Sequence, residues 1–186
     1  MNTSIKNISK LLLLLIIFNI QSAALANFHL WDLSEIYSDE SGDVLYIELF
    51  CAVNGQQFLN AHDLIATSDG NAVTFTFPGD SGSPTQDKFL LLATSNFASI
   101  PGAVTPDFIL PDQFFDRTAT NLQLNFGPGQ DIINITGADI PFDGLSSLNL
   151  LPATPTQTTN SPTNFAGNIG DIFVPPNTLF KNGFED

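Results

Sequence analysis

Residues 44–53 read Val44-Leu45-Tyr46-Ile47-Glu48-Leu49-Phe50-Cys51-Ala52-Val53, a run that is apolar at nearly every position. A run that is apolar on both faces is typical of a strand at the centre of a sheet, because neither face meets water. Glu48 is the only charged residue in it. We therefore predict a buried central strand over residues 44–53, around which the other elements assemble.

The segment before this run predicts a partner strand. Residues 28–37 are rich in apolar and aromatic side chains, and residues 38–43 between the two segments are polar, with Gly42 near their end. A short polar loop with a glycine between two apolar segments is typical of a β-hairpin. We therefore predict that residues 28–37 pair antiparallel with residues 44–53.

Two glutamates of this hairpin fall at positions that face each other in a symmetric register. If Tyr37 pairs with Tyr46, then Glu35 pairs with Glu48. Like charges directly across a sheet are destabilising. We therefore expect either that the two carboxylates are solvated or hydrogen-bonded within the protein, or that a cation lies between them.

Calcium is the cation that the second alternative implies, because it prefers oxygen ligands. The hairpin loop adds the carboxylates of Asp39, Glu40 and Asp43 close in sequence to Glu35 and Glu48. The loop does not have the length or spacing of an EF-hand. The candidate metal ligands are Glu35, Glu48, Asp39 and Asp43, with calcium as the candidate cofactor.

Strand patterns continue along the chain. Apolar, β-branched and aromatic residues recur in short segments separated by Gly, Pro, Asn and Asp, and no stretch keeps a helical period. The predicted strands span residues 28–37, 44–53, 62–67, 72–78, 88–94, 120–126, 131–136 and 145–150. So many short strands in one domain predict an all-β fold, an antiparallel two-sheet β-sandwich.

Two segments lie outside this pattern. Several prolines punctuate residues 101–111, which favours a long ordered crossover with a short helical turn near Asp112. Residues 151–186 begin with a stretch rich in Pro, Thr, Asn and Ser, which predicts an irregular extension that needs no core of its own. The predicted organisation is a β-sandwich domain over residues 27–150, followed by this extension.

The first 26 residues have the three parts of a cleavable export signal. Lys6 and Lys10 form a positive start, residues 11–18 are apolar, and Ala24-Leu25-Ala26 is a small-x-small cleavage motif. The apolar segment is shorter than the roughly 18 to 20 residues that span a bilayer. We therefore predict a signal peptide over residues 1–26, and no membrane span after its cleavage.

After cleavage the chain is strongly acidic. Lys88, Arg117 and Lys181 stand against 19 acidic residues, a net charge of −16, compared with −14 for the whole sequence. Because nucleic acids are bound largely by Lys and Arg that neutralise phosphates, the composition argues against a nucleic-acid partner. Cys51 is the only cysteine, and export without an internal disulfide suits a bacterial protein.

Catalytic motifs are sparse. Gly79-Asp80-Ser81-Gly82-Ser83-Pro84 resembles the nucleophile segment of chymotrypsin-like serine proteases, which also needs a histidine held by a carboxylate. The histidines are His29 and His62, and the mature chain is too short for the two barrels that carry such a triad. Because these six residues are ordinary turn formers, we predict a loop and a protein that is not an enzyme.

The order of motifs resembles the lamin-tail-like domains of bacterial secreted proteins. Ser34-Glu35-Ile36 and Ile47-Glu48-Leu49-Phe50 correspond to the opening strands of that family, and residues 59–64 to the segment that follows. Phe75-Thr76-Phe77-Pro78 corresponds to a strand end and residues 88–92 to an apolar strand, so the match covers about residues 28–94.

The sequence departs from that family at two places. Ser34 stands where asparagine is usual, and Ala61-His62 replaces Gly-Trp. The resemblance implies an immunoglobulin-like β-sandwich that serves as an interaction or structural module, and it provides no catalytic residues to carry over.

The C-terminal eight residues resemble a short Phe-x-x-Gly-Phe-Glu ending of exported proteins of Gram-negative bacteria. If this likeness holds, Phe180, Gly183, Phe184 and Glu185 form a sorting or surface-retention tag. The alternative is an apolar terminus that docks on the sandwich.

These patterns favour a secreted, non-catalytic binding or structural module of the bacterial cell exterior. We expect it in the medium, the periplasm or at the surface of a Gram-negative bacterium, with a protein or a glycan as its partner. One alternative is a calcium-dependent module that binds carbohydrate or a surface. Another is a small hydrolase that uses paired carboxylates, which spacing alone leaves open.

Overall fold

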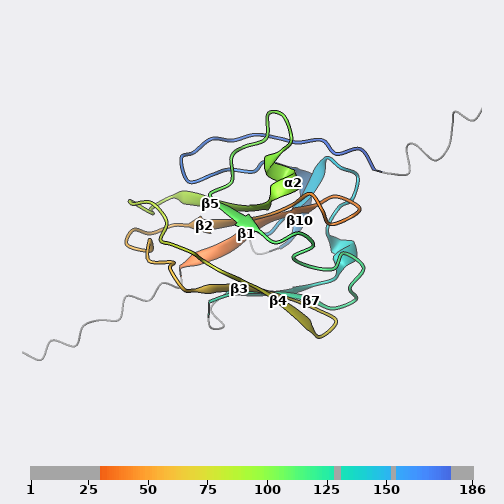
Figure 1. The fold of residues 1–186 in the computed structure, drawn as a ribbon, viewed down its shortest axis with the longest axis horizontal. Helices are drawn as coiled ribbons and strands as arrows, with labels where there is room; N and C mark the ends of the chain where they lie inside the picture. Colours follow the sequence, from red (N-terminus) through yellow and green to blue (C-terminus); the bar gives the residue numbers. More distant parts are fainter. Residues whose placement is uncertain (1–29, 128–130, 152–153, 177–186) are drawn as a thin grey trace, which may run out of the picture.

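The computed structural model describes residues 30–127, 131–151 and 154–176, and these residues form two β-sheets packed face to face (Figure 1). The strands are β1 (Trp31–Ser38), β2 (Leu45–Cys51), β3 (Asp63–Ser68), β4 (Asn71–Thr76), β5 (Lys88–Thr94), β6 (Phe108–Leu110), β7 (Leu122–Phe126), β8 (Asp131–Ile135), β9 (Ser146–Asn149) and β10 (Thr156–Thr159). The predicted all-β, two-sheet sandwich is confirmed.

Six strands form the large sheet and four form the small sheet. The order in the large sheet is β10-β9-β1-β2-β5-β6, and in the small sheet β4-β3-β7-β8. The paired strands are antiparallel except for β5 and β6, which run parallel. β2 is therefore an interior strand of the large sheet, as its unbroken apolar run predicts.

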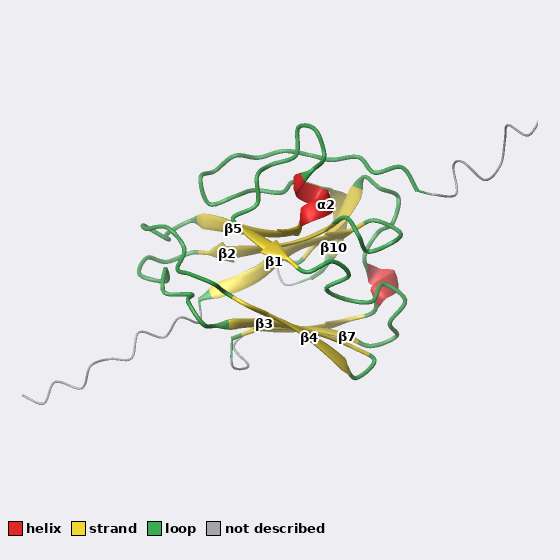
Figure 2. Cartoon of the chain, viewed as in Figure 1, coloured by secondary structure: helices red, strands yellow, loops and turns green. Residues whose placement is uncertain are grey.

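Helical structure in the described residues is limited to two short pieces (Figure 2). They are α2 (Ser95–Ala98) and the 3-10 helix η1 (Gly137–Asp139). Thr94 caps α2 by accepting a hydrogen bond from the amide of Phe97. The helical turn expected near Asp112 is instead a turn without helix. No helix in the described part of the chain is long and apolar enough to cross a membrane.

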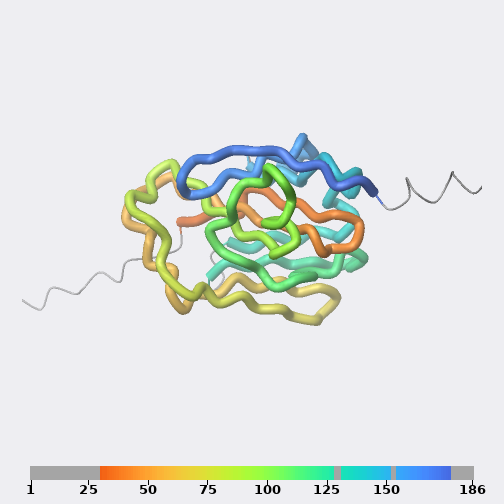
Figure 3. The backbone as a smooth tube through the Cα atoms, turned by 45° about the horizontal axis from the view of Figure 1, so that its top comes forward, coloured from red at the N-terminus to blue at the C-terminus, as the bar shows by residue number. Residues whose placement is uncertain are grey.

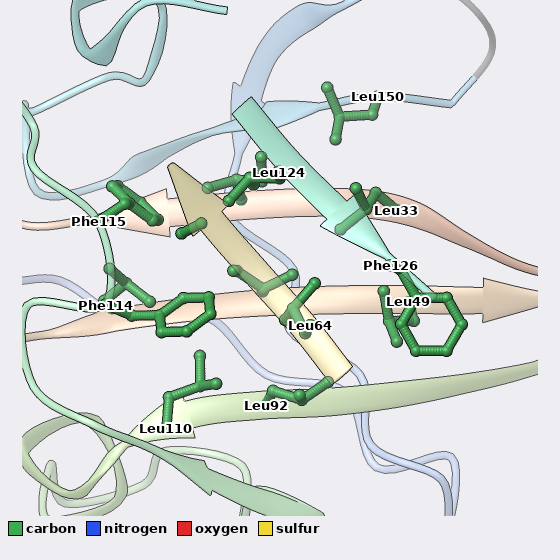
Figure 4. Close-up of a cluster of buried hydrophobic side chains, with 14 of the residues drawn as sticks. Leu33, Leu49, Leu64, Leu92, Leu110, Phe114, Phe115, Leu124, Phe126 and Leu150 are labelled. Carbon is green, nitrogen blue, oxygen red and sulfur yellow. The ribbon is translucent and has the colours of Figure 1, made fainter. Parts of the chain in front are cut away.

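The main core lies between the two sheets. Strand alternation sends one face of each strand inward, where side chains of both sheets interdigitate. Figure 4 shows part of this cluster, including Leu33, Leu49, Leu64, Leu92, Leu124 and Phe126. Cys51 is a free thiol buried in the same cluster, so it packs as a small apolar side chain.

The extension begins with a strand and then crosses the outer face of the large sheet. β10 pairs with β9, so it widens the sheet by one strand. Residues 160–176, here called the strap, then run over the side of the large sheet that faces away from the small sheet (Figure 3). The extension thus covers a face that would otherwise be open.

A second apolar cluster lies beneath the strap. Its buried members are Tyr37, Tyr46, Leu91, Ala93, Phe97, Val104 and Ile172. The rings of Tyr37 and Tyr46 are stacked, with centroids 5.5 Å apart. Ile172 is the contribution of the strap, so the strap completes this cluster by the same burial of apolar surface that builds the main core.

Replacing Gly144 with alanine is expected to lower the free energy of unfolding by about 3 kcal/mol. Gly144 has a φ of +77°, which lies in the left-handed region that favours glycine. An added Cβ would also collide with the carbonyl group of Val174 in the strap. Its own carbonyl also accepts hydrogen bonds from the Tyr37 hydroxyl and the Val174 amide. Urea unfolding would measure the change, and an effect within error would contradict this close approach.

Candidate functional site

The two glutamates singled out by the sequence face each other on the outer face of the large sheet. The register pairs Tyr37 with Tyr46 and Glu35 with Glu48, with a bulge between Leu33 and Glu35. The predicted register is therefore confirmed. Glu35 is 2% exposed and Glu48 is 3% exposed, so both carboxylates are buried beneath the strap rather than solvated.

Glu35 accepts four hydrogen bonds from neutral donors. Its Oε1 accepts from the hydroxyls of Tyr46 and Ser147 and from the amide of Ser161 at 2.9 Å. Its Oε2 accepts from the Ser161 hydroxyl at 2.9 Å. The donors come from β2, β9 and the strap, so this one carboxylate joins three parts of the chain. All four contacts use the carboxylate of Glu35 as an acceptor.

Glu48 has fewer donors and a strongly shifted pKa. Its Oε1 accepts from the Ser34 hydroxyl at 2.8 Å, and its Oε2 accepts from the Thr163 amide at 2.7 Å. Burial raises the pKa of Glu48 to about 8, and the negative charge of Glu35 adds to this, while the donors from Ser34 and Thr163 oppose it. Burial next to a second carboxylate therefore favours the protonated form of Glu48.

A third carboxylate extends the same pattern. Asp107, immediately before β6, accepts from the amides of Leu91 and Phe165 at 2.8 and 2.9 Å. The strap thus donates the amides of Ser161, Thr163 and Phe165, which are alternate residues, to Glu35, Glu48 and Asp107 in turn. We call these three acids the carboxylate ladder. The three carboxylates accept the hydrogen bonds that the carbonyl groups of a neighbouring strand would otherwise accept.

A recess of about 230 Å³ adjoins the ladder. The lining of this outer-face recess is Ser34, Glu35, Glu48, Phe50, Phe89, Asn149, Leu151, Ser161 and Thr163. The rings of Phe50 and Phe89 are 5.0 Å apart and give it one apolar side. It therefore combines two acidic side chains with an aromatic pair.

The other two candidate metal ligands are engaged within the hairpin loop. Asp39 accepts from the Ser41 hydroxyl and the Val44 amide, and Asp43 accepts from the side chain of Gln113. Over residues 30–127, 131–151 and 154–176, no three His, Cys, Asp or Glu side chains are grouped to hold a metal ion. At Glu35 and Glu48 a cation would have to displace hydroxyl and amide donors. The calcium site stays an untested alternative, and the hydrogen bonds at Glu35 and Glu48 argue against it.

Millimolar calcium is expected to leave the melting temperature of the mature protein unchanged. The oxygens of Glu35 and Glu48 already accept hydrogen bonds. Calcium would have to displace those donors, and the cost of leaving them unpaired exceeds the free energy of binding at a weak site. Differential scanning calorimetry with calcium, magnesium or chelator would measure this. A melting temperature that rises and saturates with calcium, but not with magnesium, would contradict the expectation and establish a cation site.

A larger recess lies at one end of the sandwich. This loop-end recess has a volume of about 390 Å³, and it is formed by the β1–β2 loop, the β3–β4 hairpin and the connection between β6 and β7. Its lining is Glu40, Ser41, Ser68, Asn71, Val73, Gln113, Phe115, Asp116, Arg117 and Thr118. Most of these side chains are polar, so the recess suits a polar ligand.

Arg117 is the only cation in this lining, and its guanidinium is used to join chain segments. It donates to the carbonyls of Ser38, Ile140 and Pro141 at 2.8 to 3.0 Å and lies over the ring of Phe142. Burial lowers its pKa. Asp116 accepts from Thr118, which lowers the pKa of that exposed carboxyl. The recess therefore favours neutral polar groups over anions.

The protease-like segment is a loop, as predicted. The Ser81 hydroxyl donates to the carbonyl of Gly82, and the Asp80 carboxylate accepts from the amide of Asn60. Asp80 thus fastens this loop to the segment before β3. His62 lies beside that segment, and its carbonyl accepts from Phe77.

Several sequence predictions fall outside the described residues. These are the signal peptide over residues 1–26, His29, and the sorting-tag candidates Phe180, Gly183, Phe184 and Glu185. Sequence reasoning missed Asp107 and the strap donors, because the signal for them is only an acid beside Pro106 and a run of Ser, Thr and Asn. It also missed the loop-end recess, whose lining comes from three distant segments.

Comparison with known proteins adds no relative. No protein-family model matches the sequence, and neither the curated proteins nor the solved structures give a match. The features of this protein that bear on its function are therefore the two recesses and the carboxylate ladder.

Proposed function

We propose that this protein is a secreted, non-catalytic binding or structural module of the bacterial cell exterior, built on a lamin-tail-like domain. The loop-end recess is the observation that carries the proposal. Binding sites are often formed by loops that a rigid scaffold holds in place, and here two packed sheets hold three such segments. The partner is a protein or glycan that presents neutral polar groups to the recess.

The carboxylate ladder supports the non-catalytic part of this proposal. Glu35 is the most enclosed acid of the hairpin, and its oxygens accept hydrogen bonds from the protein itself. An acid whose lone pairs are occupied by internal donors acts as a structural anchor. Both acids of the pair accept hydrogen bonds from the strap, so their burial is explained by a structural role.

Binding of the purified mature chain to washed envelopes of the producing cells tests the proposed site. The double variant Asn71→Ala and Gln113→Ala removes two polar side chains of the loop-end recess, and Asn96→Ala on α2 is the matched control. We expect at least ten-fold weaker binding for the double variant and unchanged binding for the control. Equal binding of all three proteins would overturn the assignment of the recess.

Fractionation of the producing cells tests the proposed location. The mature protein, with and without residues 178–186, would be blotted in the cytoplasm, periplasm, outer membrane and medium. Retention at the surface that is lost on truncation supports the sorting tag and a displayed module. Accumulation of both forms in the cytoplasm would overturn secretion, whereas release of both into the medium would overturn the tag alone.

A small hydrolase is the second candidate, and one observation favours it. Glu35 and Glu48 both line the outer-face recess, and burial raises the pKa of Glu48 to about 8, as a general acid requires. Hydrolysis of a panel of nitrophenyl glycosides by the mature protein and by Glu48→Gln would test it. Turnover that is lost in the variant supports the hydrolase, and equal background rates overturn it.

A further inference from the structure

β4 is an edge strand of the small sheet, and it has none of the features that usually protect such an edge. It pairs with β3 on one side, and no other strand in the described part of the chain pairs with its far side. Five of its six residues are exposed, none is charged or a proline, and its register with β3 has no bulge. Proteins usually shield an edge strand in one of these ways, because bare backbone donors and acceptors attract further strands. β4 is therefore open to an additional strand.

The other three edge strands are shorter or carry a charge. β6 and β10, at the two ends of the large sheet, have three and four residues, so they offer few backbone groups. β8, at the far end of the small sheet, begins with Asp131, whose carboxylate accepts a hydrogen bond from the amide of Leu33 on β1. β4 is the longest of the four edges. The contrast favours a specific role for its exposed side.

The turn between β3 and β4 determines which backbone groups face this open side. Residues 69–70 form a two-residue turn in which both φ angles are positive. In such a hairpin the pair that flanks the turn is hydrogen-bonded, and bonded and non-bonded pairs then alternate. Asn71 belongs to the flanking pair. The amides and carbonyls of Ala72, Thr74 and Thr76 therefore point away from β3.

The open edge of β4 adjoins the loop-end recess. Asn71 and Val73 both line this recess of about 390 Å³, and Val73 is 37% exposed. Side chains alternate between the faces of a sheet, and cross-strand neighbours share a face. Every second side chain of a strand added to β4 would therefore lie beside Asn71 and Val73. The backbone of β4 can hold such a strand while the recess receives its alternate side chains.

We propose that β4 and the loop-end recess together bind an extended segment of a partner polypeptide. The segment adds to the small sheet as a strand beside β4, and its alternate side chains, uncharged or basic, enter the recess. This inference rests on the proposed binding function of the recess and names the class of its partner. In strand addition, main-chain hydrogen bonds provide affinity, and pockets for alternate side chains provide specificity.

Charge favours a different polypeptide over a second copy of this chain. Each mature chain has a net charge of −16, so two copies repel each other as they approach. The recess lining includes the carboxylates of Glu40 and Asp116, whereas the guanidinium of Arg117 is engaged with three carbonyls. An acidic segment would be repelled here, and an uncharged or basic segment would not.

Thr74→Pro tests the proposal, because it removes an amide that points to the open side and leaves the hydrogen bonds between β3 and β4 in place. Proline is tolerated on an edge strand where the N–H faces solvent. Thr74→Ala keeps the amide and is the matched control. Binding of each mature protein to washed envelopes of the producing cells would be measured before and after the envelopes are digested with a protease. Far-UV circular dichroism would establish that each variant folds.

We expect binding to fall by about ten-fold in Thr74→Pro, through the loss of one main-chain hydrogen bond, and to stay unchanged in Thr74→Ala. Binding of the unaltered protein should be lost on the digested envelopes. If Thr74→Pro does not fold, Ala72→Pro removes the next outward amide and replaces it in the comparison.

Full binding by Thr74→Pro, together with weak binding by the double variant at Asn71 and Gln113, would overturn strand addition and leave the recess as a site for another ligand. Undiminished binding to digested envelopes would also overturn it and would indicate a glycan. A dimer in sedimentation that Thr74→Pro dissociates would assign the edge to a second copy, against the proposal. Full binding by every variant, or no binding by the unaltered protein, would overturn both strand addition and the proposed binding site.

Discussion

Replacing Glu35 with alanine is expected to lower the free energy of unfolding by about 3 to 5 kcal/mol. The substitution removes the shared acceptor of Tyr46, Ser147 and Ser161. Tyr46 and Ser147 are fully buried, so their hydroxyls would be left without this acceptor in a place that water does not reach. Each buried donor that loses its partner costs about 1 to 3 kcal/mol.

Urea unfolding monitored by far-UV circular dichroism would measure the loss for Glu35→Ala. The matched control is Asp112→Ala, which removes an exposed carboxylate and should change stability by no more than about 0.5 kcal/mol. Glu35→Gln keeps one oxygen acceptor and should lie between the two. A change for Glu35→Ala as small as that for Asp112→Ala would show that the hydrogen bonds at Glu35 do not hold the fold.

The second large effect is expected at Asn160, whose replacement with alanine should cost about 2 to 4 kcal/mol. Asn160 is 2% exposed. Its amide donates to the carbonyls of Leu145 and Ile172, and its Oδ1 accepts from the Ile172 amide. One side chain therefore joins the start of the strap, its later part and the loop before β9.

The matched control for this variant is Asn168→Ala, at an exposed position of the same strap. We expect Asn160→Ala to lower the urea midpoint and to speed exchange of the Ile172 amide, whereas Asn168→Ala changes neither. Equal effects of the two substitutions would contradict the role of Asn160 in connecting the start of the strap to Ile172 in its later part.

The strands of the sandwich could be predicted because each carries its own pattern. Residues 44–53 are apolar on both faces, and β2 is an interior strand of the large sheet. Each predicted strand overlaps an observed one, and the predicted pairing of Tyr37 with Tyr46 is the observed register. The register could be predicted because the length of a hairpin loop determines which residues of the two strands face each other.

β6 and β10 could not be predicted in the same way. β6 has only three residues within the proline-rich crossover, and β10 is the exposed, uncharged Thr156–Thr159 in the expected extension. Neither carries an alternation long enough to indicate a strand. Both exist because an open edge of the large sheet offers them a partner, β5 for one and β9 for the other. Tertiary pairing thus outweighs local composition.

Two acids of the candidate site, Glu35 and Glu48, could be predicted from the sequence, whereas Asp107 and the hydrogen-bond donors could not. The hairpin register alone places Glu35 opposite Glu48. Ser147 and Ser161, which donate to Glu35, lie 112 and 126 residues away in the sequence, and no local pattern connects them. The choice between a solvated pair, an internally hydrogen-bonded pair and a cation site depends on those distant donors. That is why the sequence left the alternatives open.

Amide hydrogen exchange of individual strap residues, followed by NMR at neutral pH, tests most directly the claim that acids of the large sheet hold the strap. We expect the amides of Ser161, Thr163 and Phe165 to exchange slowly and that of the exposed Ala166 to exchange rapidly. Rapid exchange at all four positions would contradict this and would mean that Glu35, Glu48 and Asp107 do not hold the strap.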